Sequence, residues 1–540
     1  MLKLAHIVVL SGPVCAGKST LASGLAAEYQ TVTLKTHDFL IEIQPGLEQQ
    51  RRVLQEFGEK LDQKTGGTWV REALDKIIQR ENYDDRETLV IDSIRIAGQI
   101  DALRKAYGRR ILHIHLTAPV PILAKRYKHR KPATIAELPT YDAVLANKTE
   151  AQVETLREIA DVVIDTKRNT ASDVVSRVAC HIGLHGRDYS RLVDVLVGGE
   201  YGSEGKGQIA AYLSPEYELL VRVGGPNAGH SVYEEPEPYI FHHLPSGTRV
   251  SRAQLLLGPG AVISERTLLK EIAECGVEYD RLSIDPQAMI ISDEDVKNEE
   301  RLRKTIGSTG QGVGYATARK ILGRQTSETK LARDVPNLKP YIRDSCAVLE
   351  RAFREGNKIL LEGTQGTGLS LHHGSYPHVT SRDTTVAGCL AEAGISPSRV
   401  RKVVMVCRTY PIRVQSPAEE GMTSGPMSQE LSWREISKRS GIPYTELKKH
   451  EITSTTKRQR RVAEFDWTLL RKAASLNAPT DIALTFADYL NVKNRKARRF
   501  EQLDSEAMQL IDEIERIAAA PVSLVSTRFH HRSIIDRRAW

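Results

Sequence analysis

The stretch Val-Leu-Val-Gly-Gly-Glu-Tyr-Gly-Ser-Glu-Gly-Lys-Gly-Gln at residues 195–208 decides the fold of most of this chain. It continues an apolar run that begins at Val193 and is typical of a buried strand. The run breaks into a glycine-rich turn that ends in Gly-Lys-Gly and enters a helical pattern. Glycines let main-chain N–H groups close around an anion, and Lys206 adds a positive charge. The stretch therefore predicts a strand, a phosphate-binding loop and a helix.

A second motif, Arg-Val-Gly-Gly-Pro-Asn-Ala-Gly-His, occupies residues 222–230. Together the two stretches resemble the phosphate loop and the catalytic-histidine loop of adenylosuccinate synthetases. Further motifs in the same order extend the resemblance over residues 192–540. It implies an α/β ligase that phosphorylates the 6-oxygen of a purine nucleotide with a nucleoside triphosphate and Mg²⁺. The amine of L-aspartate then displaces the phosphate. The resemblance also implies a homodimer.

The resemblance implies a role for each matching residue. Catalysis would involve Lys206, His230 and the residue at position 203, and the Gly229 carbonyl would bind Mg²⁺. Contacts to nucleotides and phosphates would come from Gly202, Glu204, Gly205, Gly207, Asn227, Thr309, Gln365, Thr380, Asp488 and Ser526. The aspartate substrate would be bound by Thr455, Arg458 and Arg460, because the planar guanidinium group suits carboxylates.

Two segments leave the phosphoryl donor open. The family's base-recognition segment reads Thr-Lys-x-Asp, and here Phe486 replaces the lysine while Asp488 is kept. The family's C-terminal Ser-Thr-Gly becomes Ser-Thr-Arg at residues 526–528. The donor is therefore expected to be GTP, ATP or dATP.

Ser203 stands where the family carries a catalytic aspartate. A serine hydroxyl does not ionise near pH 7, so it cannot replace the aspartate as a base. Three interpretations stay open. Ser203 makes room for a 2-amino group, and the substrate is GMP or dGMP, as in phage enzymes of this type. Alternatively, the substrate is IMP, and Glu200 or Glu204 is the base. In the third, turnover is impaired and the chain senses nucleotides, with its N-terminal part as the output.

The N-terminal third carries a separate phosphate-binding motif. An apolar run over residues 4–11 leads into Gly-Pro-Val-Cys-Ala-Gly-Lys-Ser-Thr at residues 12–20, followed by a helical pattern. This is a P-loop in its expected strand–helix context. Lys18 would contact the β- and γ-phosphates and Ser19 would bind Mg²⁺. The P-loop residues are Gly12, Gly17, Lys18, Ser19 and Thr20.

Further apolar runs alternate with helical patterns after the P-loop, which predicts a parallel sheet with helices on both faces. Arg126 and Arg130 are four residues apart and share one helix face. They resemble the lid arginines of nucleoside-monophosphate kinases. We expect a P-loop nucleotide-kinase-like domain over residues 1–184, a linker over 185–191 and the ligase over 192–540.

The composition limits the partners of this protein. Of its 540 residues, 40% are apolar and 27% charged, and no apolar run approaches the roughly 20 residues of a membrane helix. A net charge of +8 favours anionic small molecules. Nucleic acid is disfavoured because aromatic residues make up 6% and are not interleaved with the basic clusters. Six scattered cysteines fit a reducing cytoplasm.

Overall fold

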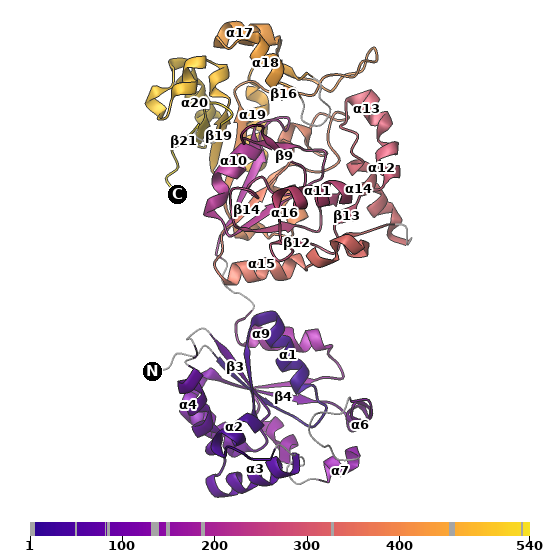
Figure 1. Ribbon diagram of the computed structural model, residues 1–540, viewed down its shortest axis with the longest axis vertical. Helices are drawn as coiled ribbons and strands as arrows, with labels where there is room; N and C mark the ends of the chain where they lie inside the picture. Colours follow the sequence, from indigo (N-terminus) through magenta and orange to yellow (C-terminus); the bar gives the residue numbers. More distant parts are fainter. Residues whose placement is uncertain are drawn as a thin grey trace. The chain divides into compact units, whose positions relative to one another are not determined.

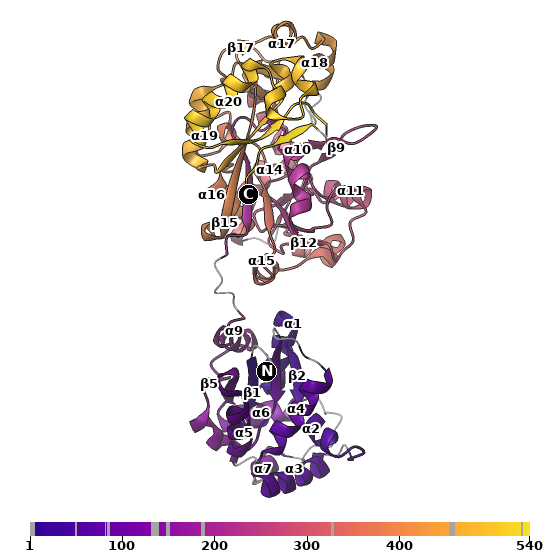
Figure 2. The same ribbon diagram turned by 90° about the vertical axis from the view of Figure 1, so that its left-hand side faces the viewer.

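The computed structural model describes residues 6–48, 51–81, 83, 87–130, 140–146, 152–184, 190–325, 329–452, 459–530 and 533–540. The chain divides into two compact units, residues 1–187 and 188–540. Each unit has its own parallel sheet and its own core (Figures 1 and 2). Most of the linker predicted over residues 185–191 lies outside the described residues.

The N-terminal unit is built on a five-stranded parallel sheet with the strand order β2-β3-β1-β4-β5. Its strands are β1 (His6–Ser11), β2 (Val32–Lys35), β3 (Thr88–Asp92), β4 (Ile111–Thr117) and β5 (Val162–Asp165). Its helices are α1 (Lys18–Tyr29), α2 (Thr36–Ile43), α3 (Arg51–Thr65), α4 (Trp69–Glu81), α5 (Ala97–Tyr107), α6 (Val120–Lys128), α7 (Tyr141–Leu145) and α9 (Ala171–His181). Alternate residues of β1 enter two separate core clusters, so helices cover both faces. This confirms the predicted parallel sheet with helices on both faces.

The C-terminal unit contains a nine-stranded sheet with the order β12-β10-β7-β14-β6-β15-β19-β20-β21. Its strands are, in that order, Leu282–Ile284, Gln254–Leu257, Leu219–Arg222, Ile359–Glu362, Val193–Gly198, Val400–Arg408, Asp481–Thr485, Val522–Ser526 and Ile534–Asp536. Every neighbouring pair is parallel except β20 and β21. The α/β fold expected for this unit is confirmed.

Helices cover both faces of this larger sheet. They are α10 (Lys206–Leu213), α11 (Glu265–Cys275), α12 (Asp293–Asn298), α13 (Glu300–Ile306), α14 (Val313–Leu322), α15 (Ser345–Arg354), α16 (Val386–Ala393), α17 (Trp433–Ser440), α18 (Tyr444–His450), α19 (Trp467–Asn477) and α20 (Ser505–Ala518). Small ribbons join β8 (His230–Val232) to β9 (Tyr239–Phe241), β11 (Val262–Ile263) to β13 (Met289–Ile290), and β18 (Arg461–Ala463) to β16 (Ile412–Arg413) and β17 (Glu430–Leu431).

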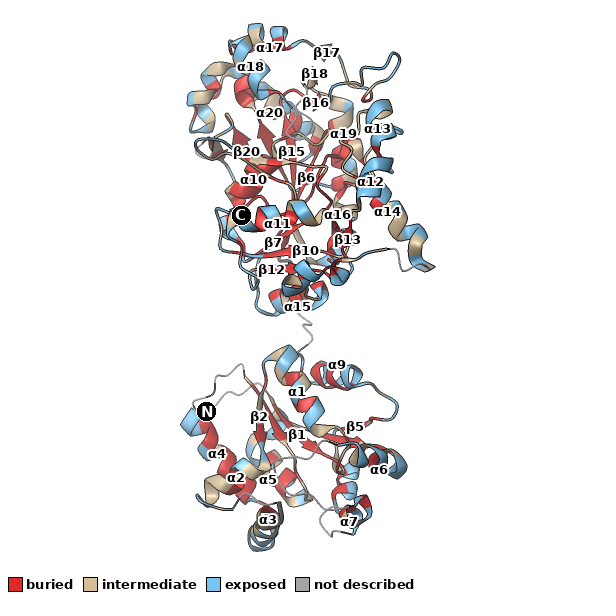
Figure 3. Ribbon diagram, turned by 45° about the vertical axis from the view of Figure 1, so that its right-hand side comes forward, coloured by how far each residue is buried: buried red, intermediate tan, exposed pale blue. Residues whose placement is uncertain are grey.

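Strand β6 is the centre of this unit and is buried along its whole length. Val193, Val195 and Val197 pack into one core cluster, and Leu196 packs into the other. Because side chains alternate between the faces of a strand, one apolar run supplies both cores. Figure 3 shows the central strands buried while the helices expose their outer faces. The glycine-rich loop after β6 therefore starts from a rigid strand.

Among the described residues, no helix has the length and apolar character needed to cross a membrane.

Candidate functional site

The C-terminal unit contains a cavity of about 1650 Å³. The predicted site residues that line it are Gly202, Ser203, Gly205, Lys206, Gly207, Asn227, Gly229, His230, Thr309, Gln365, Thr380, Arg460 and Asp488. Glu204 and Ser526 do not line it. Thr455 and Arg458 lie outside the described residues. Residues that are far apart in the sequence are thus gathered around one space.

Glu204 braces the phosphate loop from inside. Its side chain is fully buried, and Oε1 accepts hydrogen bonds from the main-chain N–H groups of Glu200 (3.0 Å) and Gly202 (2.8 Å). Oε2 accepts a hydrogen bond from Lys206 Nζ at 2.6 Å. Gly205 has φ +87° and caps α10, a conformation that glycine adopts without strain. Glu204 therefore shapes the loop and holds Lys206, and its carboxylate does not face the cavity.

Close packing places His230 against the first turn of α10. A Cβ atom added at Gly207 would lie 2.8 Å from the Cβ of His230. Only glycine permits this approach, because real Cβ contacts are longer. The glycine at position 207 thus brings the imidazole beside the phosphate loop.

Glu362, at the end of β14, orients His230. Its Oε1 lies 2.5 Å from His230 Nδ1, while Nε2 has no hydrogen-bond partner among the described residues. Ser246 N donates to Glu362 Oε2 at 2.7 Å, and Arg222 lies 3.4 Å from Oε1. A carboxylate bonded to Nδ1 fixes the tautomer and orientation of an imidazole. His230 therefore keeps Nε2 available for a further partner.

Burial and neighbouring groups set the protonation states of His230 and Glu362. Burial and the nearby Arg222 lower the pKa of His230 to about 4, against the opposing effect of Glu362. Arg222, together with the hydrogen bonds to His230 and Ser246, lowers the pKa of the Glu362 carboxyl to about 2 despite burial. His230 is therefore neutral at pH 7 in the free protein. Bound anionic phosphates would raise its pKa, because a nearby negative charge favours the imidazolium form.

A buried ion cluster connects the phosphate loop to the segment around Arg460. Arg408 donates to the Ser203 carbonyl at 3.3 Å and to Glu451 Oε1 at 3.0 Å. Glu451 Oε2 accepts a hydrogen bond from Arg460 at 3.2 Å, and Oε1 also accepts one from Tyr489 at 2.6 Å. The two arginines lower the pKa of Glu451 to about 2. Glu451 is therefore an anion that fixes two cations of the cavity wall.

The nucleotide contacts predicted near β8 and β14 also lie together. Asn227 donates to Thr380 Oγ1 at 3.4 Å, while Asn227 Oδ1 has no partner among the described residues. Gln365 has φ +58°, which is uncommon for a residue other than glycine and is found at ligand sites. These side chains offer amide and hydroxyl groups to a ligand.

The two carboxylate oxygens of Asp488 differ in their hydrogen bonding. Arg495 donates to Oδ2 at 2.9 Å and also to Glu446 at 2.6 Å. Asp488 Oδ1 is buried and has no hydrogen-bond partner among the described residues. Burial raises the pKa of this carboxyl to about 6. Phe486 carries no charge, and the centre of its ring lies 4.0 Å from the Arg408 guanidinium.

The oxygen-bearing residues around position 203 determine whether Mg²⁺ could bind in this cavity. No group of three His, Cys, Asp or Glu side chains in the described part of the chain is placed to hold a metal. Ser203 and Gly229 line the cavity, and each carries neutral oxygen atoms. Mg²⁺ prefers oxygen ligands and often completes its shell with waters and substrate phosphates. The site fits Mg²⁺ only if phosphate oxygens supply the negative charge.

The N-terminal unit has a second cavity, of about 660 Å³, around the P-loop. A Cβ at Gly12 would lie 2.1 Å from the Leu116 carbonyl oxygen, and Gly17 has φ +102°. Lys18 Nζ donates to the carbonyls of Gly12 (2.6 Å) and Pro13 (2.9 Å). Thr20 also lines the cavity. The loop thus has the glycine-dependent geometry that its motif predicts.

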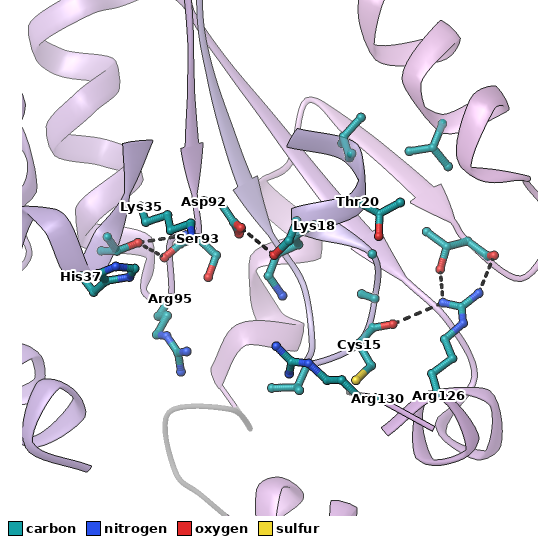
Figure 4. Close-up of a pocket in the computed structure, with 18 of the residues that line it drawn as sticks. Cys15, Lys18, Thr20, Lys35, His37, Asp92, Ser93, Arg95, Arg126 and Arg130 are labelled. Carbon is teal, nitrogen blue, oxygen red and sulfur yellow. Dashed lines mark hydrogen bonds between the residues drawn. The ribbon is translucent and has the colours of Figure 1, made fainter. Parts of the chain in front are cut away.

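Two features flank the P-loop (Figure 4). Ser19 donates to Asp92 Oδ2 at 2.9 Å, and these hard oxygens fit Mg²⁺. Arg126 donates to Thr166 Oγ1 at 2.8 Å and lies 3.3 Å from the Cys15 carbonyl, and Arg130 also lines the cavity. The predicted pair of arginines therefore lies at the P-loop.

Sequence reasoning missed Arg222, Glu362, Arg408 and Glu451. Arg222 opens the quoted motif at residues 222–230, and Glu362 stands three residues before the predicted contact Gln365, so both positions could have been singled out from the sequence. Arg408 and Glu451 stand in segments without a motif. Arg408 ends β15, Glu451 follows α18, and the two side chains meet only in the folded chain.

Comparisons with known proteins identify the family of the C-terminal unit. The adenylosuccinate synthetase family profile matches residues 195–334 and 323–495. Adenylosuccinate synthetases of Pyrococcus horikoshii and Methanocaldococcus jannaschii are each 35% identical over 353 residues, which are 64% of this chain and 98% and 96% of those proteins. The structure of the cyanophage S-2L succinoaminodeoxyadenylate synthetase, bound to dGMP and to dATP as energy donor, has 29% identity and a TM-score of 0.55. The match covers 65% of this chain and 96% of that one. The chain, through residues 195–495, belongs to the adenylosuccinate synthetase family.

Proposed function

We propose that the C-terminal unit joins L-aspartate to C6 of a guanine nucleotide, GMP or dGMP. The observation that carries the proposal is Ser203, which lines the cavity without a carboxylate. A serine is smaller than an aspartate, and its hydroxyl both donates and accepts hydrogen bonds. It therefore tolerates a 2-amino group that a carboxylate would crowd. The similar cyanophage protein was solved with dGMP, which supports this choice.

The remaining cavity residues suit the two steps of this reaction. Lys206 and the glycine loop bind the transferring phosphoryl group, and Arg460 binds a carboxylate of aspartate. His230 Nε2 holds a proton at the 6-oxygen once phosphates have raised its pKa. Bound Mg²⁺ would supply charge neutralisation at the phosphates. Electrostatic stabilisation of this kind is the main contribution that fixed groups make to such a transfer.

The IMP interpretation has less support from the geometry. It requires Glu200 or Glu204 as the base for the purine N1 proton. Neither side chain lines the cavity. Glu204 is bonded inside the loop, and Glu200 Oε1 accepts the main-chain N–H of Arg408 at 3.1 Å. These contacts favour the guanine nucleotide over IMP.

We also propose that the phosphoryl donor is ATP or dATP rather than GTP. A guanine ring presents two adjacent N–H donors, which would need both oxygens of Asp488. Arg495 already occupies Oδ2, which leaves Oδ1 to accept one hydrogen bond from an adenine amino group. The dATP in the cyanophage structure supports the same donor.

One experiment tests both choices. Purified protein is incubated with aspartate, Mg²⁺, one donor (ATP, dATP or GTP) and one acceptor (GMP, dGMP, IMP or dIMP), and the succinyl adduct is detected by mass spectrometry. We expect adduct from GMP or dGMP with an adenine donor. Adduct from IMP alone would contradict the proposal. Ser203→Asp should shift activity toward IMP, and Arg495→Gln should raise the use of GTP.

For the N-terminal unit we propose a P-loop phosphoryl transfer to a nucleotide. The observations that support it are the glycine-dependent loop and the Ser19–Asp92 pair. Lys18→Ala should abolish transfer and leave the ligase reaction unchanged. We further propose a homodimer, which analytical ultracentrifugation would detect.

A further inference from the structure

The cations that line the larger cavity differ in whether they already have partners. Most of them, among them Lys206, Arg408 and Arg495, form ion pairs or hydrogen bonds with neighbouring groups. In the described part of the chain, the Arg301 guanidinium and the Lys449 ammonium form neither, although both residues line the cavity. These two side chains are therefore available to an anionic ligand.

Arg301 lies on the side of α13 that faces the cavity. The residues of α13 that line the cavity are Arg301, Leu302, Thr305 and Ile306, and this spacing marks one face of a helix. The residues between them, Arg303 and Lys304, do not line the cavity and are exposed. The direction of the helix face therefore separates Arg301 from the other cations of α13.

Neither of the two carboxylates that precede Arg301 in the chain pairs with it. Glu300 lies 3.9 Å from Arg303 and 4.0 Å from Lys304. Glu299 lines the cavity, but its two oxygens accept hydrogen bonds from the main-chain N–H groups at positions 312 (2.8 Å) and 314 (2.7 Å). Arg301 therefore keeps its positive charge at the cavity wall.

The turn after α13 adds hydroxyl groups to the same wall. The main-chain N–H of Ser308 donates to the Leu302 carbonyl at 3.4 Å, so the chain folds back over the last turn of the helix. Ser308 Oγ accepts a hydrogen bond from Gly310 N at 3.3 Å, which leaves the hydroxyl hydrogen to donate. Ser308 and Thr309 both line the cavity. A guanidinium beside hydroxyl donors suits a phosphate group.

Packing places this wall beside the predicted contacts of the purine nucleotide. A Cβ at Gly314 would lie 3.4 Å from the Cβ of Ser381, so the start of α14 packs against the segment that contains Thr380. Thr380 Oγ1 in turn accepts a hydrogen bond from Asn227. Arg301 is therefore at the end of the cavity that receives the purine nucleotide.

Lys449 belongs to a different end of the cavity. It stands in the last turn of α18, two residues before Glu451. Glu451 pairs with Arg460, which is the residue proposed to bind aspartate. Of the two available cations, Arg301 is the one beside the purine nucleotide.

We infer that Arg301 binds the 5′-phosphate of the purine nucleotide that accepts aspartate. The proposed ligase reaction brings three kinds of anionic group into the cavity: the phosphates of the donor, the carboxylates of aspartate and the monophosphate of the acceptor. Lys206 with the glycine loop serves the first, and Arg460 serves the second. A phosphate taken from water without a cation would be costly, and a guanidinium offers it two parallel N–H groups. The inference rests on the proposed ligase reaction and adds the residue that holds its acceptor.

Steady-state kinetics of adduct formation test this role. Arg301→Gln keeps an N–H donor but removes the charge and the fork of N–H groups. We expect the KM for GMP or dGMP to rise about 30-fold, which is the usual strength of a hydrogen bond to a charged group. The kcat, and the KM for aspartate and for ATP, should change less than about threefold, because the lost contact is to the acceptor and is equal in ground and transition states.

Two further variants separate charge from general disturbance. Arg301→Lys keeps the charge but loses the paired N–H groups, so its KM for GMP should lie between those of the wild type and Arg301→Gln. Lys304→Gln removes an exposed cation of the same helix that does not line the cavity, and it is the matched control. Its KM for GMP should equal that of the wild type.

Equilibrium binding gives a readout that does not depend on turnover. Isothermal titration compares GMP, IMP and guanosine on the full-length wild type and on Arg301→Gln. Both chains carry the same N-terminal unit, so any difference between them reports on the larger cavity. Arg301→Gln should weaken GMP and IMP by the same factor, because they share the 5′-phosphate, and should leave guanosine unchanged.

The outcomes distinguish this inference from the choice of guanine. Adduct formation from IMP alone, with the KM for IMP raised in Arg301→Gln, would refute the guanine acceptor and keep the role of Arg301. Unchanged KM and affinity for GMP and IMP in Arg301→Gln would overturn the inference. An equal loss of guanosine binding would also overturn it, because guanosine has no phosphate.

Discussion

Single side chains decide the chemistry of the larger cavity. In the proposed reaction His230 acts through Nε2, and Glu362 fixes the orientation of the ring through Nδ1. We propose that Ser203 sets which purine fits, and its main-chain carbonyl accepts a hydrogen bond from Arg408. These contacts separate the residues that touch substrates from those that position them.

Glu362→Gln tests the positioning role. The neutral amide withdraws a charge that favours the imidazolium, so the pKa of His230 falls. We expect kcat to decrease about 100-fold at pH 7, within the usual range for acid–base catalysis. The alkaline limb of the kcat–pH profile should move to lower pH. Glu392→Gln removes a half-buried carboxylate that pairs with Arg382 and is the control. If the limb stays in place in Glu362→Gln, Glu362 does not set the pKa of His230.

Glu451→Gln tests the ion cluster. Arg408 and Arg460 would keep hydrogen-bond acceptors but lose their shared anion. We expect the KM for aspartate to rise about tenfold, which corresponds to about 1.4 kcal/mol, with a change of less than about twofold for the purine nucleotide. Loss of a buried partner should also destabilise the unit by about 3–5 kcal/mol. Glu464→Gln, which removes a surface pair with Arg439, should change neither KM.

At the scale of elements, the turn from β6 into α10 is the part that local sequence describes best. An apolar strand, glycines with positive φ and a helix follow one another within residues 193–213. The P-loop between β1 and α1 repeats this arrangement in the other unit. In both loops a glycine lets a neighbouring segment pack closely against the turn: His230 packs against Gly207, and Leu116 packs against Gly12.

Gly207→Ala tests this approach. The new Cβ would meet the Cβ of His230 at 2.8 Å and force the imidazole away from the loop. We expect a loss of about 1–3 kcal/mol of stability from overpacking and a fall in kcat of at least tenfold. Gly58→Ala on α3 has its nearest atom 3.8 Å away and should leave ligase activity unchanged. Normal kcat in Gly207→Ala would show that the contact is not required.

At the scale of the whole molecule, buried histidines link stability to pH in both units. Burial lowers the pKa of His113 and His115 to about 4 in the N-terminal unit. Burial likewise lowers the pKa of His243 to about 3, and His230 behaves similarly. The unfolded chain takes up these protons near pH 6.5, whereas the folded chain does not.

We therefore expect the free energy of unfolding to fall as the pH drops from 6.5 toward 4. Each histidine contributes up to about 1.4 kcal/mol per pH unit. The low pKa values of Glu362 and Glu451 act in the same direction, and their contribution is lost between about pH 4.5 and 2. Urea unfolding at pH 7.5, 6.5, 5.5 and 4.5 measures the slope. Constant stability over this range would contradict the burial of neutral histidines.

The sequence by itself determined the features that local chemistry dictates. Apolar runs indicated the parallel strands, because strands buried on both faces need apolar side chains throughout. Glycine spacing located both phosphate loops, since only glycine combines positive φ with close approach. The motifs also named the cavity residues His230, Asn227 and Gln365.

Only the tertiary structure decided how these groups are held. Glu362 meets His230, and Glu451 meets Arg408 and Arg460, across separate elements that approach one another only in the folded chain. The tertiary structure also showed that the Glu204 carboxylate is bonded inside the phosphate loop and that Arg495 donates a hydrogen bond to one oxygen of Asp488. A charge buried far from its partner in sequence leaves no local pattern, because its stabilisation depends on distances that exist only after folding.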